Sequence, residues 1–508
     1  MLSLKKFRGG VHPDGHKDDS SALPIFTKVP IPSELVLPLC QHAGEDATPL
    51  VKPGQRVLKG EKIANATARL SANVHAPTSG TIRAIEQVTI PHPSGLTARA
   101  IIIDPDGKDE WIELNPPADP YAVDQDVLAS LVEEAGIVGM GGAIFPSAVK
   151  LRQGRRFEIK TLIVNGSECE PYLTCDDRLM RERAEEIVEG TKLVRHIIEA
   201  YRAVIAVEDN KPEALAALEK AAENIGSIEV VAVPARYPMG SAKQLIQTIT
   251  GQEVPAGARS NDIGVLVHNV GTVYAIYQAL VFGRPLISRV ATIAGDCVGT
   301  PRNVEALIGT PLQHLFDVCG GIVKPPAKLI IGGPMMGQEV PHSQMPLIKG
   351  TTGVLALTRA EVNAEMASPC IRCGRCVSAC PMGLLPLEMA RGARQDNFDM
   401  AQASGLKDCI LCGSCAYVCP SHIPLVQYFE YARGELRDRR ESEQKLVRTA
   451  ELANAREARV TAEKAAKEAA KQAAKAAKEA AKAAKKKQQA EKQKEAASVA
   501  ATDEADDE

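Results

Sequence analysis

The sequence C-I-R-C-G-R-C-V-S-A-C-P occupies residues 370–381, and C-I-L-C-G-S-C-A-Y-V-C-P repeats its cysteine spacing at residues 409–420. Two-residue gaps let three thiolates reach three irons of one cubane, whereas the fourth cysteine, followed by proline, ligates the other cluster. We therefore predict two 4Fe–4S clusters in a ferredoxin-like domain over residues 358–434. The predicted groups are Cys370, Cys373 and Cys376 with Cys419, and Cys409, Cys412 and Cys415 with Cys380.

Structural zinc is the other common explanation of clustered cysteines. Zinc sites usually take their ligands as two pairs, whereas each motif here offers a triplet and one more cysteine. Gly374, Gly413 and Ser414 are small, so backbone N–H groups can approach the sulfur atoms and tune the cluster potential. An odd total of 13 cysteines indicates a reducing compartment rather than a disulfide framework. Cys40, Cys169, Cys175, Cys297 and Cys319 are isolated in sequence and fit buried packing positions.

Length and composition indicate a soluble protein of several domains. A chain of 508 residues is too long for one hydrophobic core, and 45% hydrophobic with 24% charged residues is ordinary for globular protein. A net charge of -3 gives no general attraction to nucleic acid, so no such partner is expected. The first ten residues, MLSLKKFRGG, lack the apolar core of a signal peptide.

One uncharged stretch, residues 263–283, could be mistaken for a membrane span. It contains His268, Asn269 and Gln278, which a single isolated span would bury without partners. We expect a buried strand–turn–helix there, and a peripheral protein if the chain works at a membrane.

The rest of the chain predicts a multidomain α/β and α+β fold. Residues 1–110 hold short β-like runs and turns such as H-A-P-T-S-G at 75–80. They resemble a lipoyl-type barrel-sandwich domain, but A-R-L at 68–70 offers no modifiable lysine. Residues 120–280 alternate helices and strands, which is typical of a parallel sheet. We expect helices at 127–135 and 181–199, strands at 161–164, 203–207 and 228–233, and a small β-grasp-like domain over 285–345.

Residues 435–508 form a charged tail of low complexity. Lysines recur there at spacings of three and four, which places them in a stripe on one face of an Ala-rich helix. Leu, Ile and Phe are absent between Lys464 and Ser498, so no coiled-coil seam is expected. A solvated helix is the simplest interpretation, and a charge-based contact with anionic lipid or a partner is the alternative. The acidic end, residues 503–508, is expected to be disordered.

A glycine-rich loop and a following strand end predict a nucleotide-type site. The loop, G-I-V-G-M-G-G-A-I-F-P-S-A-V-K-L at 136–151, lets backbone amides close on an anion, and Lys150 could neutralise a phosphate. It is neither a Walker A loop nor a G-x-G-x-x-G fingerprint. N-G-S-E-C-E-P at 165–171 ends a predicted parallel strand, where α/β sheets bind ligands, and D-D-R follows at 176–178. Each segment alone could be an ordinary turn.

These segments resemble the flavin core of the NADH-oxidising flavoprotein subunit of respiratory complex I, as do Y-P-M-G-S-A-K-Q-L-I at 237–246 and H-N-V-G-T at 268–272. The whole order is similar to the C subunit of the Rnf (Rsx) ion-translocating electron transport family. That order runs from F-R-G-G at 7–10 through G-G-P-M-M-G at 332–337 to the cysteine motifs. The resemblance implies noncovalent FMN, NADH as two-electron partner, and two 4Fe–4S clusters as one-electron exit.

Carried over by position, the resemblance also implies roles for single residues, none of them a catalytic acid or base. Gly139, Gly141, Gly142 and Lys150 would line the phosphate and flavin loop. Asn165, Ser167, Glu168, Asn269 and Thr272 would contact flavin, and Glu170 and Phe145 would position NADH. The chain departs from the complex I pattern at Ser241-Ala242, where that subunit has an acidic pair, and at Ser167, where it has Asp.

The implied protein is a peripheral subunit on the cytoplasmic face of the bacterial inner membrane. It would pass electrons between NADH and a ferredoxin-like partner through integral membrane subunits that move ions. Two alternatives remain open: a soluble flavin-dependent cobalamin reductase, and a non-catalytic iron–sulfur electron relay whose flavin loop has decayed.

Overall fold

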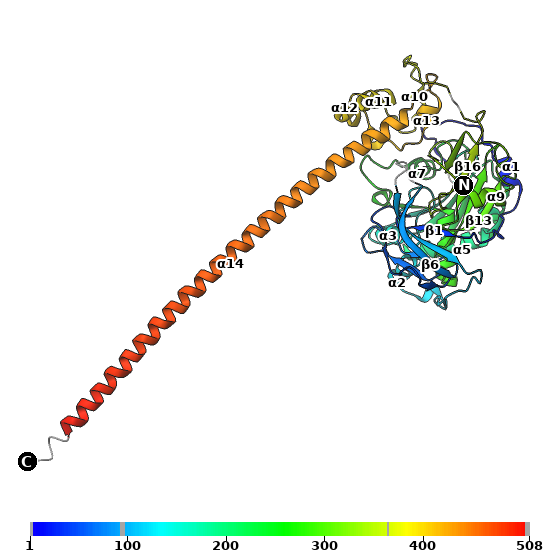
Figure 1. The fold of residues 1–508 in the computed structure, drawn as a ribbon. Coiled ribbons are helices and arrows are strands. Elements are labelled where there is room, and N and C mark those ends of the chain that lie inside the picture. The colour runs from blue at the N-terminus through cyan, green and yellow to red at the C-terminus, as the bar shows by residue number, and fades with distance from the viewer. Residues whose placement is uncertain (1–3, 92–96, 363–364, 503–508) are drawn as a thin grey trace, which may run out of the picture. The chain divides into compact units, whose positions relative to one another are not determined.

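The computed structural model describes residues 4–91, 97–362 and 365–502 (Figure 1). The chain divides into a compact unit, Met1–Glu430, and a second unit, Tyr431–Glu508. Within the compact unit, two small antiparallel sheets, a parallel sheet, a mixed sheet and the cysteine motifs follow one another along the chain.

Strands before residue 110 form the two antiparallel sheets of a barrel-sandwich. Along β1 and β7, Leu35 and Leu37 pack with Ile101 and Ile103 in the core, because alternate residues of a strand share a face. One sheet has the order β1-β7-β6-β3 (Leu35–Pro38, Thr97–Pro105, Gly80–Thr89, Arg56–Val57), and the other β2-β4-β5 (Thr48–Pro49, Lys62–Asn65, Val74–His75).

Residues 5–26, which we call the N-terminal strap, lie against the later domains of the compact unit. The strap includes the short helix α1 (Asp18–Ala22). Its backbone bonds to four separate regions: Lys5 N to Thr248 O at 2.9 Å, Gly10 N to Ala379 O at 2.9 Å, Val11 N to Tyr237 O at 2.9 Å, and Phe26 N to Asn303 O at 2.9 Å. The strap therefore connects the parallel sheet, the cysteine motifs and the mixed sheet.

The parallel sheet has the order β10-β9-β8-β11 (Ile228–Val233, Arg202–Glu208, Thr161–Gly166, Val265–Asn269). The middles of its strands are mostly apolar because helices cover both faces. In β8, Leu162 and Val164 point to one side and Ile163 to the other. Helix α7 (Ala242–Thr250) covers the Ile163 side. Helices α2, α3, α5, α6 and α8 (Gln125–Glu134, Ser147–Gly154, Ala184–Ile197, Pro212–Ala221, Val270–Phe282) cover the Leu162 side.

The helix expected at 181–199 is α5 (Ala184–Ile197), except that residues 181 and 182 belong to the preceding helix α4. Helix α4 spans Cys175–Glu182 and α5 begins at Ala184, because Arg183 between them leaves the helical conformation at φ -134° and ψ 34°. Asp176 and Asp177 lie in the first turn of α4. The uncharged stretch 263–283 is strand β11 followed directly by helix α8. Within the described residues, no helix is both long enough and apolar enough to cross a membrane.

The mixed sheet has the order β13-β12-β16-β14-β15 (Arg302–Leu307, Ser288–Ala294, Gly353–Leu357, Lys328–Ile331, Gln338–Val340). Helix α9 (Leu312–Val318) fills its core with Leu315 and Phe316. Strand β16 pairs with both β12 and β14, so the sheet extends beyond the range of 285–345 expected from the sequence.

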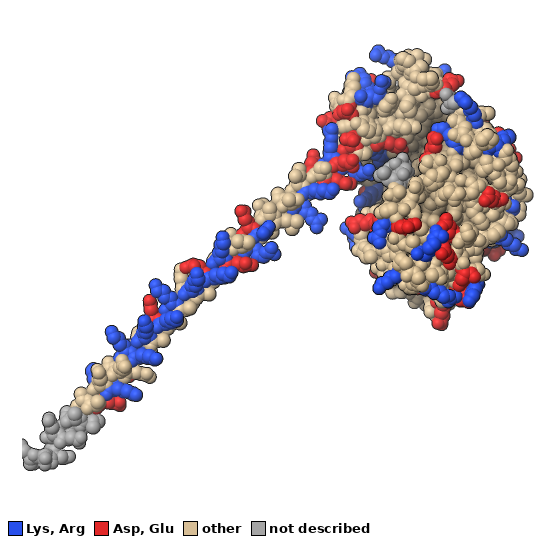
Figure 2. All heavy atoms as spheres, viewed as in Figure 1, with Lys and Arg blue, Asp and Glu red and all other residues tan. Residues whose placement is uncertain are grey.

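Short helices surround the cysteine motifs: α10 (Arg375–Ala379), α11 (Pro386–Arg394), α12 (Phe398–Ala403) and α13 (Ser414–Tyr417). Helix α14 (Leu425–Thr502) begins in the compact unit, where Leu425 and Phe429 are buried. From residue 437 to residue 497 every side chain is exposed, and Figure 2 shows basic and acidic side chains along this helix. The acidic end at 503–508 lies outside the described residues.

Lys349 joins three parts of the compact unit. Its side chain is fully buried and donates from Nζ to Asn73 O at 2.7 Å and to Gly136 O at 2.7 Å. No carboxylate pairs with it in the described part of the chain, so burial lowers the pKa of Lys349 from 10.5 to about 7.

Replacing Lys349 should change how stability depends on pH. Between pH 7 and 10.5 the unfolded lysine holds a proton that the folded lysine has lost, so stability rises with pH. One such group contributes at most about 1.4 kcal/mol per pH unit. We expect the melting temperature to rise less between pH 7.5 and pH 9.5 in Lys349→Met than in the wild type. The exposed control Lys108→Met should show the same rise as the wild type. Equal pH dependence in wild type and Lys349→Met would contradict the assignment.

Candidate functional site

Two asparagines meet at the carboxyl edge of the parallel sheet. Asn165 is the next-to-last residue of β8 and is the register partner of Asn269, which ends β11. The Nδ2 of Asn165 donates to Gly240 O at 2.8 Å, and its Oδ1 accepts from Ser167 N at 3.0 Å. The Nδ2 of Asn269 donates to Asp176 Oδ2 at 2.6 Å. Both side chains therefore order the loops that follow the strands.

The glycine-rich loop lies beside Asn269 and leads into α3. Met140 N donates to Thr272 Oγ1 at 2.9 Å, and a Cβ on Gly141 would lie 3.3 Å from the Cβ of Asn269. A Cβ on Gly142 would meet nothing within 4 Å, and one on Gly139 would meet only backbone atoms of Phe145, at 3.5 Å or more. Packing within the protein therefore leaves space at Gly139 and Gly142.

Lys150 brings a buried positive charge to this edge. It donates to the backbone oxygen of Val267 in β11, and burial lowers its pKa from 10.5 to about 8. Neighbouring His268 has its pKa lowered by burial and then by the charge of Lys150. No carboxylate neutralises Lys150 among the residues that the structure describes. An anion would therefore be stabilised beside it.

Glu168 turns its carboxylate toward the start of α4. Its oxygens accept from Asp176 N at 2.9 Å, from Asp177 N at 3.2 Å and from Cys175 Sγ at 3.3 Å, so they satisfy free N–H groups of the first turn. Burial, and then the charge of Glu168, raise the pKa of Asp176 to about 7. The neighbouring Ser167 Oγ is buried and, within the described ranges, has no hydrogen-bond partner.

Glu170 lies on the side of the site that faces the cysteine motifs. Its Oε2 accepts from Met335 N at 3.0 Å, and its Oε1 lies 3.4 Å from the hydroxyl oxygen of Tyr237. Burial raises the pKa of Glu170 to about 7. A Cβ on Gly333 would lie 2.1 Å from Glu170 Oε2, so only glycine fits at this position beside the carboxylate. Half-buried Phe145 closes the glycine-rich loop through its carbonyl oxygen, which accepts from Gly139 N at 2.8 Å.

Ser241 and Ala242 lie at the start of α7, where the complex I flavoprotein has its acidic pair. Ser241 is the residue before the helix, and Ala242 is its first residue. No carboxylate is therefore contributed by these two positions to the sheet edge.

The two cysteine motifs share one backbone conformation. Arg372 and Leu411, at equivalent positions, have φ of 55° and 56°, and Gly374 and Gly413 have φ of 77° and 76°. The N–H groups of Arg372 and Leu411 donate to Cys370 Sγ and Cys409 Sγ, each at 3.4 Å. Such hydrogen bonds stabilise the negative charge of ligated sulfur.

Thiols of the two motifs lie close enough to affect one another's pKa. Burial, and then the charges of Cys409, Cys412 and Cys380, raise the pKa of Cys415. Burial also raises the pKa of Cys376, with smaller effects from Cys373 and Cys419. The last cysteine of each motif therefore lies near the thiols of the other motif, as cluster ligation would require.

The second motif is the inner one. Cys412 and Cys415 are buried, whereas Cys370 and Cys373 are exposed. The hydroxyl of Tyr237 donates to Cys412 O at 2.7 Å. A Cβ on Gly413 would lie 2.8 Å from Met335 O. The second motif is therefore in direct contact with the residues around Glu170.

Several residues of this region were not predicted from the sequence. The contact of Tyr237 with Cys412, the role of the loop 332–337 and the position of Arg289 depend on tertiary packing. Arg289 is buried and donates from Nη2 to Met140 O at 3.0 Å. The D-D-R segment at 176–178 could have indicated Asp176 as a site residue. No motif near Arg289 in the sequence indicates that it belongs to the site.

The arrangement fits FMN and iron–sulfur clusters by its chemistry. An open glycine-rich loop, the unneutralised Lys150 and the unpaired Ser167 Oγ suit a phosphorylated cofactor at the sheet edge. Two sets of thiols, each with backbone N–H groups directed at sulfur, suit cubanes.

Four family models match successive parts of the chain. They are the RnfC barrel sandwich hybrid domain at residues 5–108, the Nuo51 FMN-binding domain at 132–278, the SLBB domain at 290–339 and the 4Fe–4S dicluster domain at 369–423. The structure also has partial similarity to a chain of an NAD+-reducing [NiFe]-hydrogenase, with a TM-score of 0.45, 18% identity and 63% of each chain covered.

Curated relatives match most of the chain, and each is named as the C subunit of an ion-translocating oxidoreductase complex. The protein from Rhodobacter capsulatus is 47% identical over 86% of this chain and 84% of its own. Those from Vibrio cholerae and Klebsiella pneumoniae are 46% and 44% identical over 91% of this chain, which corresponds to 60% and 61% of their own lengths. The chain therefore belongs to the RnfC family, the C subunits of ion-translocating oxidoreductase complexes, which is an electron-transport family.

Proposed function

We propose that this chain transfers electrons between NADH and two 4Fe–4S clusters through noncovalently bound FMN at the edge of β8 and β11. The observation that carries the proposal is the contact of this edge with the inner cysteine motif. The Tyr237 hydroxyl donates to Cys412 O at 2.7 Å, and its oxygen lies 3.4 Å from Glu170 Oε1. A cofactor at the sheet edge would thus be separated from the inner cluster by a few buried side chains.

FMN accepts electrons in pairs from NADH and releases them singly, whereas one cubane takes one electron at a time. The role of the chain's own residues would be to bind FMN and to orient it and the nicotinamide. Lys150 would hold the phosphate charge, and Ser167 would offer its free hydroxyl. Asn165, Asn269 and Thr272 would order the loops around the flavin, and Glu168 would do so through α4. Gly139, Gly141 and Gly142 would leave room for it, and Glu170 and Phe145 would position the nicotinamide.

The proposed electron path runs from the sheet edge to the inner cluster and then to the exposed one. Cys409, Cys412, Cys415 and Cys380 would hold the inner cluster, and Cys370, Cys373, Cys376 and Cys419 the outer one. The exposed Cys370 and Cys373 suit exchange with a ferredoxin-like partner. The names of the relatives support a place in a membrane complex with ion-moving subunits, where this chain would be peripheral on the cytoplasmic face.

A non-catalytic electron relay is the second candidate. It is favoured by the start of α7, which carries Ser241 and Ala242 in place of an acidic pair, and by Glu168, whose oxygens are occupied at α4. Flavin content and the response to NADH distinguish the two candidates.

Anaerobic titration of the full chain with NADH tests the electron path. We expect about eight irons per chain, as in two-cluster ferredoxins. A flavin band should bleach with NADH, followed by loss of the broad cluster absorbance. If the clusters are present but no flavin binds and NADH changes nothing, the chain is a relay and NADH is oxidised elsewhere.

Gly139→Ala tests whether the glycine-rich loop needs a glycine at this position for FMN binding rather than for folding. The added Cβ meets protein atoms no closer than 3.5 Å, so thermal stability should stay near the wild-type value. If FMN lies against this loop, the added methyl group should push its phosphate away from a loop N–H, and its affinity should fall about tenfold or more, because one charge-assisted hydrogen bond is worth about 1.5–3 kcal/mol. Fluorescence titration of the deflavinated protein measures this. Gly226→Ala is the control, since its Cβ meets nothing within 4 Å. Unchanged FMN affinity in Gly139→Ala would place the cofactor elsewhere.

Gly9→Ala tests the inner cluster through the strap. Gly9 has a φ of 68°, and its Cβ would lie 2.5 Å from Cys380 O. We expect displacement of Cys380 and loss of the inner cluster, which leaves about four irons per chain by the two-cluster stoichiometry. Iron analysis and electron paramagnetic resonance report this directly. Gly15→Ala, whose nearest contact is 3.8 Å, should keep both clusters. Full iron content in Gly9→Ala would show that the strap does not position this ligand.

A further inference from the structure

Residues 464–497 of helix α14 differ in composition from the part of the helix before them. They contain only Ala, Lys, Glu and Gln, all of which are strong helix formers. Residues 464–495 hold eleven lysines and four glutamates, a net charge of +7, whereas residues 437–459 hold seven basic and five acidic residues, a net charge of +2. The positive charge of the helix is therefore concentrated in this later segment, along which Figure 2 shows basic side chains.

Seven lysines of this segment lie on one face of α14, and we call them the lysine stripe. At about 100° per residue they fall within an arc of about 80°, over a length of about 30 Å. No other residue between 464 and 485 falls within this arc, and the four glutamates lie outside it. All seven side chains are exposed. The stripe consists of Lys464, Lys467, Lys471, Lys475, Lys478, Lys482 and Lys485.

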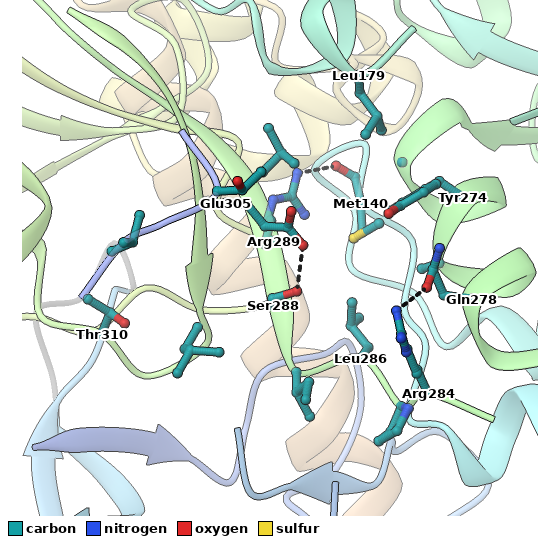
Figure 3. Close-up of a pocket in the computed structure, with 18 of the residues that line it drawn as sticks. Met140, Leu179, Tyr274, Gln278, Arg284, Leu286, Ser288, Arg289, Glu305 and Thr310 are labelled. Atoms are coloured by element: carbon teal, nitrogen blue, oxygen red, sulfur yellow. Dashed lines mark hydrogen bonds between the residues drawn. The ribbon is translucent and has the colours of Figure 1, made fainter. Parts of the chain in front are cut away.

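The shape of this segment suits a surface as its partner rather than a small molecule. Small ligands are held in cavities, such as the one of about 370 Å³ in Figure 3, which borders the proposed flavin site through Asp176 and Gly271. Every side chain from residue 437 to residue 497 is exposed, and one helix cannot enclose a ligand. A straight stripe of charge can instead lie along an extended surface of opposite charge.

The residue types of the segment favour a lipid surface over a protein or a nucleic acid. Protein interfaces are anchored by buried Trp, Tyr or Arg side chains, and residues 464–497 contain none of these. Nucleic-acid sites use Arg for bidentate contacts and aromatic rings for stacking on bases, and both are absent as well. Lysine is a point charge on a flexible stem, so it can follow a surface of many separate negative charges. A second copy of the stripe would be repelled by its like charge.

We propose that the lysine stripe binds the headgroup surface of a bilayer that contains anionic lipid. Clusters of about four to eight basic residues are typical of segments that bind such membranes, and the stripe has seven lysines. Because residues 464–497 contain no apolar side chain larger than alanine, nothing inserts among the acyl chains and the contact is electrostatic. This inference rests on the peripheral membrane location in the proposed function, and it assigns the membrane contact to a particular face of α14.

Co-sedimentation of the full chain with lipid vesicles tests the proposal. The probes are vesicles of equal parts phosphatidylcholine and phosphatidylglycerol, and vesicles of phosphatidylcholine alone. We expect binding to the anionic vesicles only. This binding should be lost when NaCl is raised from about 0.1 M to about 1 M, because the Debye length falls from about 10 Å to about 3 Å. Equal binding to both kinds of vesicle, or to neither, would overturn the proposal. Release of the bound chain by poly-glutamate at an equal concentration of negative charge would overturn it in favour of an acidic protein partner.

Two double variants of equal net charge test which face binds. Lys475→Gln with Lys482→Gln removes two charges from the stripe, and Lys487→Gln with Lys494→Gln removes two, at the same spacing, from a face about 120° away. The first should weaken binding to anionic vesicles about twenty-five-fold, or about fivefold per lysine, and the second less than about fivefold. Glutamine keeps the helix propensity of lysine, and circular dichroism should confirm an unchanged helix content. Equal losses in the two variants would show that net charge, and not this face, determines binding.

Titration with NADH separates this inference from the proposed function. Both double variants should show wild-type reduction of flavin and clusters, because the changed side chains are exposed and belong to the second unit. A chain that NADH reduces but that does not bind anionic vesicles would overturn the lipid contact alone. A chain that binds anionic vesicles but does not respond to NADH would overturn the electron path alone and support the lipid contact.

Discussion

The contact between the edge of the parallel sheet and the inner cysteine motif is the constraint on which the compact unit depends. Tyr237 bonds to the carbonyl of Cys412, Glu170 bonds to the backbone of Met335, and a Cβ on Gly413 would collide with the carbonyl of that methionine. Close-packed interiors transmit such constraints, since no space is left for the parts to shift independently. The strap bonds to Tyr237 and to Ala379 beside this contact, and the loop between β14 and β15 of the mixed sheet forms part of it.

The positive charges near the sheet edge are held in a particular way. Lys17, Lys150 and Arg289 each donate to backbone carbonyl oxygens of loops and strands around the site. The chain thus places cations beside main-chain groups, whose partial charges neutralise them only in part. Buried in this way, they orient the loops and give the edge a positive potential suited to a phosphorylated ligand.

How much could be predicted from the sequence differs from element to element. The cysteine motifs were readable because cluster ligation imposes a fixed spacing, and Asn165 and Asn269 because parallel strands bring their ends together. The strand and helix at 265–282 followed from their apolar pattern and polar interruptions. The break at Arg183 was missed because amphipathic periodicity continues across it. Strand β16 was missed because its pairing with β12 and β14 is remote in sequence.

Within the site, the sequence indicated which residues gather but not where their side chains point. Glu168 is in the predicted loop, yet its carboxylate bonds to N–H groups at the start of α4, since a helix end without partners is costly. The Tyr237–Cys412 bond joins residues 175 positions apart, and no local pattern encodes it.

The strap has a consequence for how the protein is made. Its residues leave the ribosome before the cysteine motifs do, yet Gly10 bonds to Ala379 and a Cβ on Gly9 would collide with Cys380, which are synthesised much later. Domains generally fold from the N-terminus as they emerge. Here the first segment must remain unpacked until the cysteine motifs have been translated. Closure of the compact unit is thus delayed until the whole cluster-binding region is present.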